Sequence, residues 1–87
     1  MMNTYETLKR ALEERIPLTA ELLLLSGEHR KRETVIVAAL NLVTVTFFEA
    51  GKGFRSAPLS LVQRVSLEPE QKPIADALYS ILDAKAL

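Results

Sequence analysis

The chain has 87 residues, enough for one domain (1–87) with a core of modest size. It contains no cysteine and one histidine, which excludes disulfide bonds and argues against a metal cluster, so we expect no cofactor. Eleven basic and eleven acidic residues balance to zero, whereas dedicated nucleic-acid binders usually carry a basic excess. No apolar run approaches the roughly 18 residues of a membrane span, and charges interrupt the N-terminal segment, so we expect a cytoplasmic protein without membrane association.

The first predicted element is a helix over Asn3–Arg15. Asn3 can cap this helix, and Glu6 stands three residues later, as in a capping box. Pro17 disfavours helical geometry at the preceding residue and therefore marks the end. One narrow apolar stripe recurs at helical spacing: Tyr5, Leu8, Leu12 and Ile16.

A first strand is predicted over Leu18–Ser26, because Pro17 precedes it, Gly27 follows it and the segment is short. Residues Leu22–Leu25 are apolar on both faces of such a strand. We therefore expect them to be buried on both sides, either inside the fold or at a subunit contact.

The second and third strands follow a turn. The second strand is predicted over Thr34–Leu40, and Asn41 breaks the run. The third, over Leu42–Phe48, alternates clearly, with Val43, Val45 and Phe47 expected on one face.

Two more strands complete the sheet. The fourth starts at Phe54, and Pro58, which has no N–H to donate, makes it short or places it at an edge. The fifth is predicted over Val62–Leu67, after a turn.

A second helix is predicted over Glu70–Lys85. Pro73 is tolerated only in the first turn, so the regular helix should begin near Lys72. The apolar stripe of this helix is predicted to consist of Ile74, Ala77, Leu78, Ile81, Leu82 and Lys85.

The order of elements and the short connections predict the fold class. Connections this short cannot form parallel crossovers, so the sheet should be antiparallel. We expect an α+β domain, mainly β, with an N-terminal helix, a five-stranded and strongly bent antiparallel sheet or barrel, and a C-terminal helix.

Three segments resemble landmarks of a known superfamily, namely the junction of helix and first strand, the end of strand one, and the passage from strand four to strand five: 12–19, 24–27 and 54–65. Over residues 5–68 the chain resembles the Sm-like small β-barrels, which include Sm, LSm and Hfq proteins and relatives such as YolD-like and WYL-domain proteins. The C-terminal helix, residues 70–85, is an addition to the minimal family layout.

This resemblance implies a homo-oligomeric ring that binds RNA. Sm-like proteins close rings by pairing strand four of one subunit with strand five of the next, which also removes exposed sheet edges. It further implies that Phe54 stacks on a base and that Arg55 pairs with a phosphate. Alternatively, Phe54 belongs to the core and Arg55 faces water.

A surplus of apolar surface also favours oligomerisation. The predicted interface consists of Leu22, Leu24, Phe54 and Val65. The alternative is a monomer in which the last helix covers the open end of the barrel.

The main basic cluster is Arg30, Lys31 and Arg32, which we expect at the turn before the second strand. These side chains can contact phosphates in RNA. The alternative is a solvated hairpin rim whose charge is partly balanced by Glu28 and Glu33.

Catalysis is not expected. His29 lies on a polar turn without a nearby nucleophile and acid, while Asp76 and Asp83 lie on the last helix. The sequence therefore favours a non-enzymatic, Sm-like RNA-associated protein. Two alternatives remain: a scaffold module that binds a protein partner through the Leu78 and Leu82 face, and a small ligand-sensing module of the WYL type.

Overall fold

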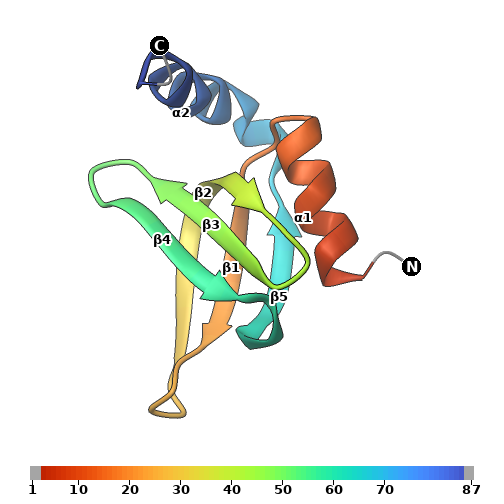
Figure 1. Cartoon of the computed structure of the whole chain (residues 1–87). Helices are drawn as coiled ribbons and strands as arrows, with labels where there is room; N and C mark the ends of the chain where they lie inside the picture. The colour runs from red at the N-terminus through yellow and green to blue at the C-terminus, as the bar shows by residue number, and fades with distance from the viewer. Residues whose placement is uncertain (1–2, 86–87) are drawn as a thin grey trace.

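The structure is a computed structural model that describes residues 3–85. One helix precedes and one follows five strands (Figure 1). A single-turn 3-10 helix, η1, lies between β4 and β5, and a second, η2, lies between β5 and α2. The bounds are α1 Thr4–Glu13, β1 Leu18–Leu23, β2 His29–Leu40, β3 Thr44–Glu49, β4 Gly53–Pro58, η1 Leu59–Leu61, β5 Val62–Leu67, η2 Pro69–Gln71 and α2 Lys72–Lys85. This is the α+β fold predicted from the sequence, with a fifth strand at the expected residues.

The five strands form one antiparallel sheet in the order β4-β3-β2-β1-β5. The sheet is strongly bent and remains open, with β4 and β5 as its two edges (Figure 1). The central strand, β2, has 12 residues and serves both halves: its first half pairs with β1 and its second half pairs with β3. The expected edge position of β4, inferred from Pro58, is confirmed.

The bend of β2 coincides with a local irregularity at Thr34. The backbone of Thr34 has φ 52°, and the register with β1 shifts between the pairs Leu18–Val35 and Ala20–Arg32. Such a bulge bends a strand and increases its twist. It also changes which side chains of β2 face the inside of the sheet before and after this point.

The main core lies between the concave face of the sheet and α1. Leu8 and Ala11 of α1 are fully buried against this face. The strands contribute the rest of the buried cluster: Leu18, Ala20, Leu22, Val35, Val37, Val45, Phe47 and Val62. The predicted N-cap is confirmed, because the Asn3 Oδ1 accepts a hydrogen bond from the Glu6 N–H at 2.8 Å.

The second helix, α2, packs on the opposite, outer face of β2. A separate buried cluster joins the two: Ile36, Phe48, Ala75, Leu78 and Tyr79. The Tyr79 hydroxyl donates to the Val37 carbonyl at 2.7 Å, and the Lys72 ammonium donates to the carbonyl of Glu14 at 3.1 Å. The chain therefore has one core on each side of β2.

The predicted apolar stripe of the last helix is wrong in detail. Ile74 and Ile81 are 42% and 44% exposed, whereas Ala75 and Tyr79, which the prediction left out, are buried. The helix is rotated toward Tyr79 because the hydroxyl of this residue finds a backbone acceptor in β2. The predicted beginning near Lys72 is confirmed.

The predicted third strand began two residues too early. The Asn41 Oδ1 accepts hydrogen bonds from the N–H groups of Val43 and Thr44, both at 2.8 Å, and this turn ends β2 at Leu40. Leu42 and Val43 are consequently exposed in a loop, and the prediction that Val43 shares a strand face with Val45 and Phe47 is wrong. Asparagine commonly forms such turns.

Burial of both faces of Leu22–Leu25 inside the fold, the first of the two alternatives, is wrong for Leu25, whereas Leu22 is buried. Strand β1 ends at Leu23, and Leu25 lies 98% exposed in the turn that contains Gly27 (φ 89°). Because β2 begins at His29, the basic residues Arg30–Arg32 lie within a strand and not at the turn where they were predicted.

Over residues 3–85, no helix has both the length and the apolar composition that crossing a membrane requires.

Candidate functional site

The three consecutive basic residues of β2 do not form one patch. Residues directly opposite each other on antiparallel strands share a face, and Arg30 and Arg32 stand opposite Leu22 and Ala20, whose side chains are buried. Lys31 stands opposite Glu21 and faces the other side. Arg30 and Arg32 therefore lie on the concave side of the sheet, and Lys31 lies on the outer side.

Arg32 is held against an acidic residue of β3. Its side chain is 16% exposed, and its guanidinium lies 4.0 Å from the Glu49 carboxylate, which also pairs with Lys52 at 3.3 Å. The Arg32 Nε is buried and has no hydrogen-bond partner among the described residues. Because the ion pair between Arg32 and Glu49 is long, the carboxylate balances the positive charge of Arg32 only in part.

Phe54 and Arg55 are neighbours in β4 and therefore point to opposite faces. Phe54 is 49% exposed and rests on Phe48, with ring centroids 5.0 Å apart, which places it on the side of α2. Full burial of Phe54 in the core, the alternative considered above, is thus wrong. Since Arg55 faces the other side, these two residues cannot hold the base and the phosphate of one nucleotide together.

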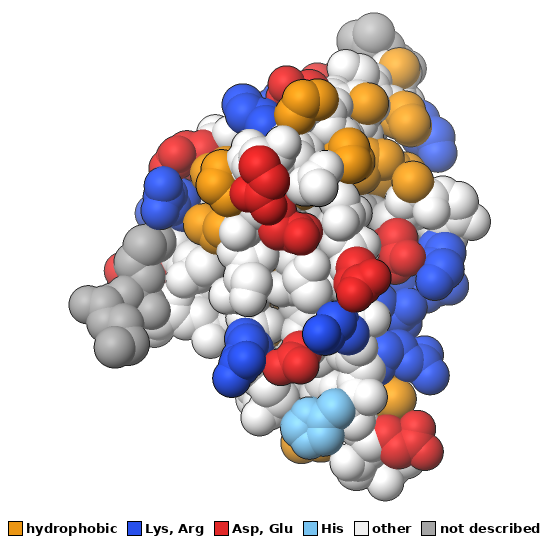
Figure 2. All heavy atoms as spheres, turned by 180° about the vertical axis from the view of Figure 1, so that it is seen from behind, with side chains coloured by type: hydrophobic (Ala, Val, Ile, Leu, Met, Phe, Trp, Pro, Cys, Tyr) orange, Lys and Arg blue, Asp and Glu red, His pale blue; other side chains and the backbone are white. Residues whose placement is uncertain are grey.

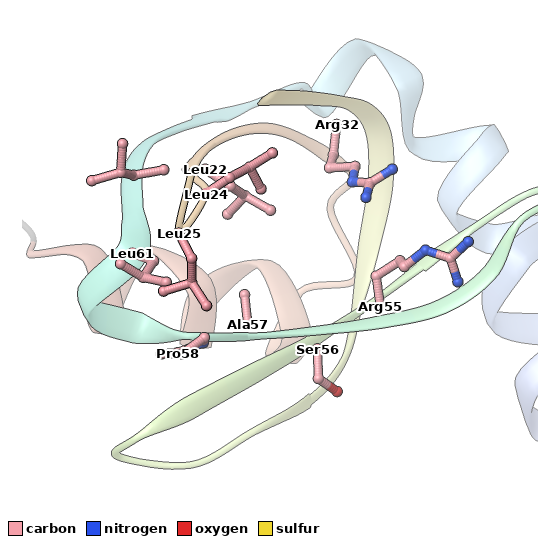
Figure 3. Close-up of a pocket in the computed structure, with 10 residues that line it drawn as sticks. Leu22, Leu24, Leu25, Arg32, Arg55, Ser56, Ala57, Pro58 and Leu61 are labelled. Atoms are coloured by element: carbon pink, nitrogen blue, oxygen red, sulfur yellow. The ribbon is translucent and has the colours of Figure 1, made fainter. Parts of the chain in front are cut away.

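Arg55 and Arg32 both line a pocket between the end of β1 and the edge strand β4. This pocket, the leucine pocket, has a volume of about 310 Å³ and is lined by Leu22, Leu23, Leu24, Leu25, Arg32, Arg55, Ser56, Ala57, Pro58 and Leu61. In Figure 3 the leucine side chains gather at one end, while both arginines point to the other end. The pocket therefore has an apolar end and a cationic end.

The outer side of β1 carries a smaller, polar depression of about 110 Å³, lined by Thr19, Glu21, Lys31, Arg64 and Ser66. Arg64 pairs loosely with Glu21 at 3.8 Å. Figure 2, which shows the back of the molecule, has basic and acidic side chains mixed over this region and hydrophobic side chains gathered over α2 at the top. Lys31 lines this polar depression and does not line the leucine pocket.

The four predicted interface residues are divided in the same way. Leu22 is buried, and Leu24 is half-buried in the leucine pocket, so both lie on the concave side. Val65 of β5 is half-buried against the main core, while Phe54 lies on the side of α2. A partner strand along β4 or β5 would touch them from different sides.

The protein-partner face proposed for Leu78 and Leu82 is not available. Leu78 is buried between α2 and the sheet, and Leu82 is half-buried beside it. The exposed apolar residues of α2 are Ile74 and Ile81, which the 3.6-residue period places on one face.

Sequence reasoning missed Ala57, Leu61 and Glu49 as parts of the concave site. Strand alternation from Arg55 to Ala57 is a signal that could have found the first of these. The position of Leu61 depends on η1, which turns the chain back toward β1. No local sequence pattern predicts this turn.

Among residues 3–85, no three His, Asp or Glu side chains come together as a metal site. The described titratable residue with a clearly shifted pKa is Tyr79. Burial raises the pKa of Tyr79 to about 12, and its hydroxyl serves to attach α2 to β2.

No protein-family model, curated protein or solved structure matches the chain. The resemblance to the Sm-like barrels therefore stays a prediction.

Proposed function

We propose that the protein is a non-enzymatic module that assembles into a homo-oligomeric ring and binds RNA on the concave side of its sheet. The strand order β4-β3-β2-β1-β5 is the observation that carries the proposal, because it leaves β4 and β5 as the edges of one bent sheet. An unpaired edge exposes backbone N–H and C=O groups that pair readily with another strand. Each edge strand has six residues, so the two are matched in length.

Pairing of β4 with β5 of the next subunit would join two different surfaces. Such a heterologous contact repeats from subunit to subunit and forms a ring when the rotation closes. The strong bend of the sheet favours closure because it turns successive subunits. In a ring each edge is covered, which explains how a short chain tolerates two open edges.

The RNA contacts proposed here are Arg30, Arg32 and Arg55. All three lie on the concave side, and Glu49 is the carboxylate that the structure places near one of them, Arg32, at 4.0 Å. Each contact alone is weak, but a ring presents several copies, and multivalency raises the overall affinity. The zero net charge of the chain fits this arrangement only if the basic residues act together on one face.

Site-directed cross-linking tests the strand pairing. The chain has no cysteine, and Ser56 of β4 and Ser66 of β5 are exposed. We expect a mixture of Ser56→Cys and Ser66→Cys to form a covalent heterodimer with a short bifunctional maleimide, and the double variant to form a ladder of larger species. If each single variant cross-links with itself as readily as with the other, the contact is symmetric and the proposal is wrong.

RNA binding is tested with two neighbouring residues of equal charge. Arg30→Ala should weaken the binding of a single-stranded RNA and reduce the slope of log K against log salt by about one for each phosphate that is no longer neutralised. Lys31→Ala removes the same charge from the opposite face and should leave both quantities unchanged. Fluorescence anisotropy measures them, and equal effects of the two variants would show that only net charge matters.

A second candidate function is a protein-binding module, which is favoured by the exposed pair Ile74 and Ile81 on α2. Under this alternative, Ile81→Glu should abolish co-purification of the partner. Ser80→Glu, an equal charge about 100° away around the helix, should retain it. Persistence of the partner in the Ile81 variant would remove this alternative.

A further inference from the structure

The leucine pocket combines a cationic end with an apolar end, and neither assembly nor RNA binding accounts for that combination. Its volume is about 310 Å³. Small-molecule pockets in proteins begin at about 300 Å³, and an apolar cavity of about 150 Å³ is enough to bind benzene. The pocket is therefore large enough for a small organic molecule.

The cationic end consists of two guanidinium groups from strands that are not neighbours in the sheet. Within residues 3–85, no carboxylate lies within ion-pair distance of Arg55, whose NH1 instead donates to the Phe54 carbonyl at 3.0 Å. Arg32 has a buried, unpartnered Nε, and its contact with Glu49 is long at 4.0 Å. Glu49 also pairs with Lys52 at 3.3 Å, so two cations share one carboxylate here.

The apolar end is formed by side chains from three separate segments. Leu22 comes from β1 and Leu24 from the turn directly after it, Ala57 and Pro58 come from β4, and Leu61 comes from η1. Figure 3 shows these side chains gathered away from the two arginines. An apolar body placed among them would be removed from water and stabilised by roughly 25 cal/mol per Å² of buried surface.

We propose that the leucine pocket binds a small amphipathic carboxylate. The planar guanidinium of arginine matches the two oxygens of a carboxylate, and Arg55 and Arg32 would donate to them while the apolar body lies among the leucines. A group with two negative charges is disfavoured, because Glu49 stands at the same end of the pocket. The site lies within one subunit, so the proposal stands independently of the ring.

Three probes with eight carbon atoms each and different head groups test this proposal: octanoate, octan-1-ol and octylamine. Nuclease-treated protein is titrated with each probe and followed by two-dimensional NMR. We expect saturable shifts at 22–25 and 55–61 with octanoate, binding about tenfold weaker with octan-1-ol, and none with octylamine. Equal affinity for octanoate and octan-1-ol would overturn the proposal, as would the absence of saturation.

Variants separate the two ends of the pocket. Arg55→Gln should weaken octanoate about tenfold and leave octan-1-ol unchanged, whereas Leu61→Asp should weaken both. Arg64→Gln, which removes a charge from the outer face, is the matched control and should change neither affinity.

A different occupant of the pocket would also be detected. If the signals of 22–25 and Leu61, which lie outside the proposed β4–β5 contact, shift with protein concentration in the absence of any probe, a second copy of the chain fills the pocket and the proposal is wrong. Because the cross-linking experiment reports strand pairing separately, failure of one proposal can be told apart from failure of the other.

Discussion

At the scale of single residues, Tyr79 connects the last helix to the sheet. Its side chain is buried, its hydroxyl donates to the Val37 carbonyl at 2.7 Å, and the Arg15 guanidinium lies 4.9 Å from the centroid of its ring. Burial raises the pKa of Tyr79 to about 12, although the nearby Arg15 acts in the opposite direction. The neutral phenol is therefore part of the folded structure.

Replacing Tyr79 with phenylalanine should destabilise the fold. Tyr79→Phe preserves the ring but removes the donor, so the Val37 carbonyl loses this hydrogen bond at a cost of about 1–2 kcal/mol. Tyr5→Phe is the matched control, and we expect a change within about 0.5 kcal/mol. Urea unfolding gives both values, and equal effects of the two variants would contradict this role.

The raised pKa of Tyr79 also predicts a dependence of stability on pH. Because the folded pKa lies above the ordinary value of 10.0, the contribution is fully present below pH 10 and is lost as the pH rises toward about 12. Solvent screening limits the loss to at most about 2 kcal/mol. Urea unfolding at a series of alkaline pH values should show this loss in the wild type and a smaller one in Tyr79→Phe; identical losses would contradict the assignment.

At the scale of elements, local signals predicted most boundaries, and tertiary contacts decided the rest. Val62–Leu67 and the beginning of α2 at Lys72 follow from alternation and from proline, both of which act locally. The buried face of α2 does not follow from local signals. Isoleucine is more apolar than tyrosine, so the sequence favoured Ile74 and Ile81, but only Tyr79 has a hydroxyl that donates to β2. Leu42 and Val43 were wrongly predicted to belong to the third strand, because the side chain of Asn41 holds them in a turn.

Two leucine-sized residues of α2 test which face of this helix supports the fold. Leu78→Ala should cost about 2–4 kcal/mol, since Leu78 is buried against the sheet. Ile81→Ala, on the same helix but 44% exposed, should cost less than about 1 kcal/mol. Chemical denaturation measures both, and a loss at Ile81 as large as that at Leu78 would show that Ile81 is also buried against the sheet, as the stripe predicted from the sequence requires.

At the scale of the whole molecule, the bend of β2 at Thr34 shapes the concave site, while the strand order leaves β4 and β5 as open edges. The bend turns β2 between its two partners, so that Arg32 of β2 and Arg55 of β4 reach one pocket. The sequence indicated these arginines separately. That both arginines line the same pocket as Leu61 could not be predicted. This arrangement depends on the path of the chain through η1 and on the bulge at Thr34, which has no clear local sequence signal.

The native mass of the protein tests assembly through β4 and β5 most directly. Light scattering on a sizing column, after nuclease treatment and at low and high salt, compares the particle with the 9.7 kDa of one chain. We predict a closed ring of about five to seven subunits whose mass does not change with salt, because backbone pairing holds it together. A particle of one chain at both salt concentrations would contradict the proposed assembly.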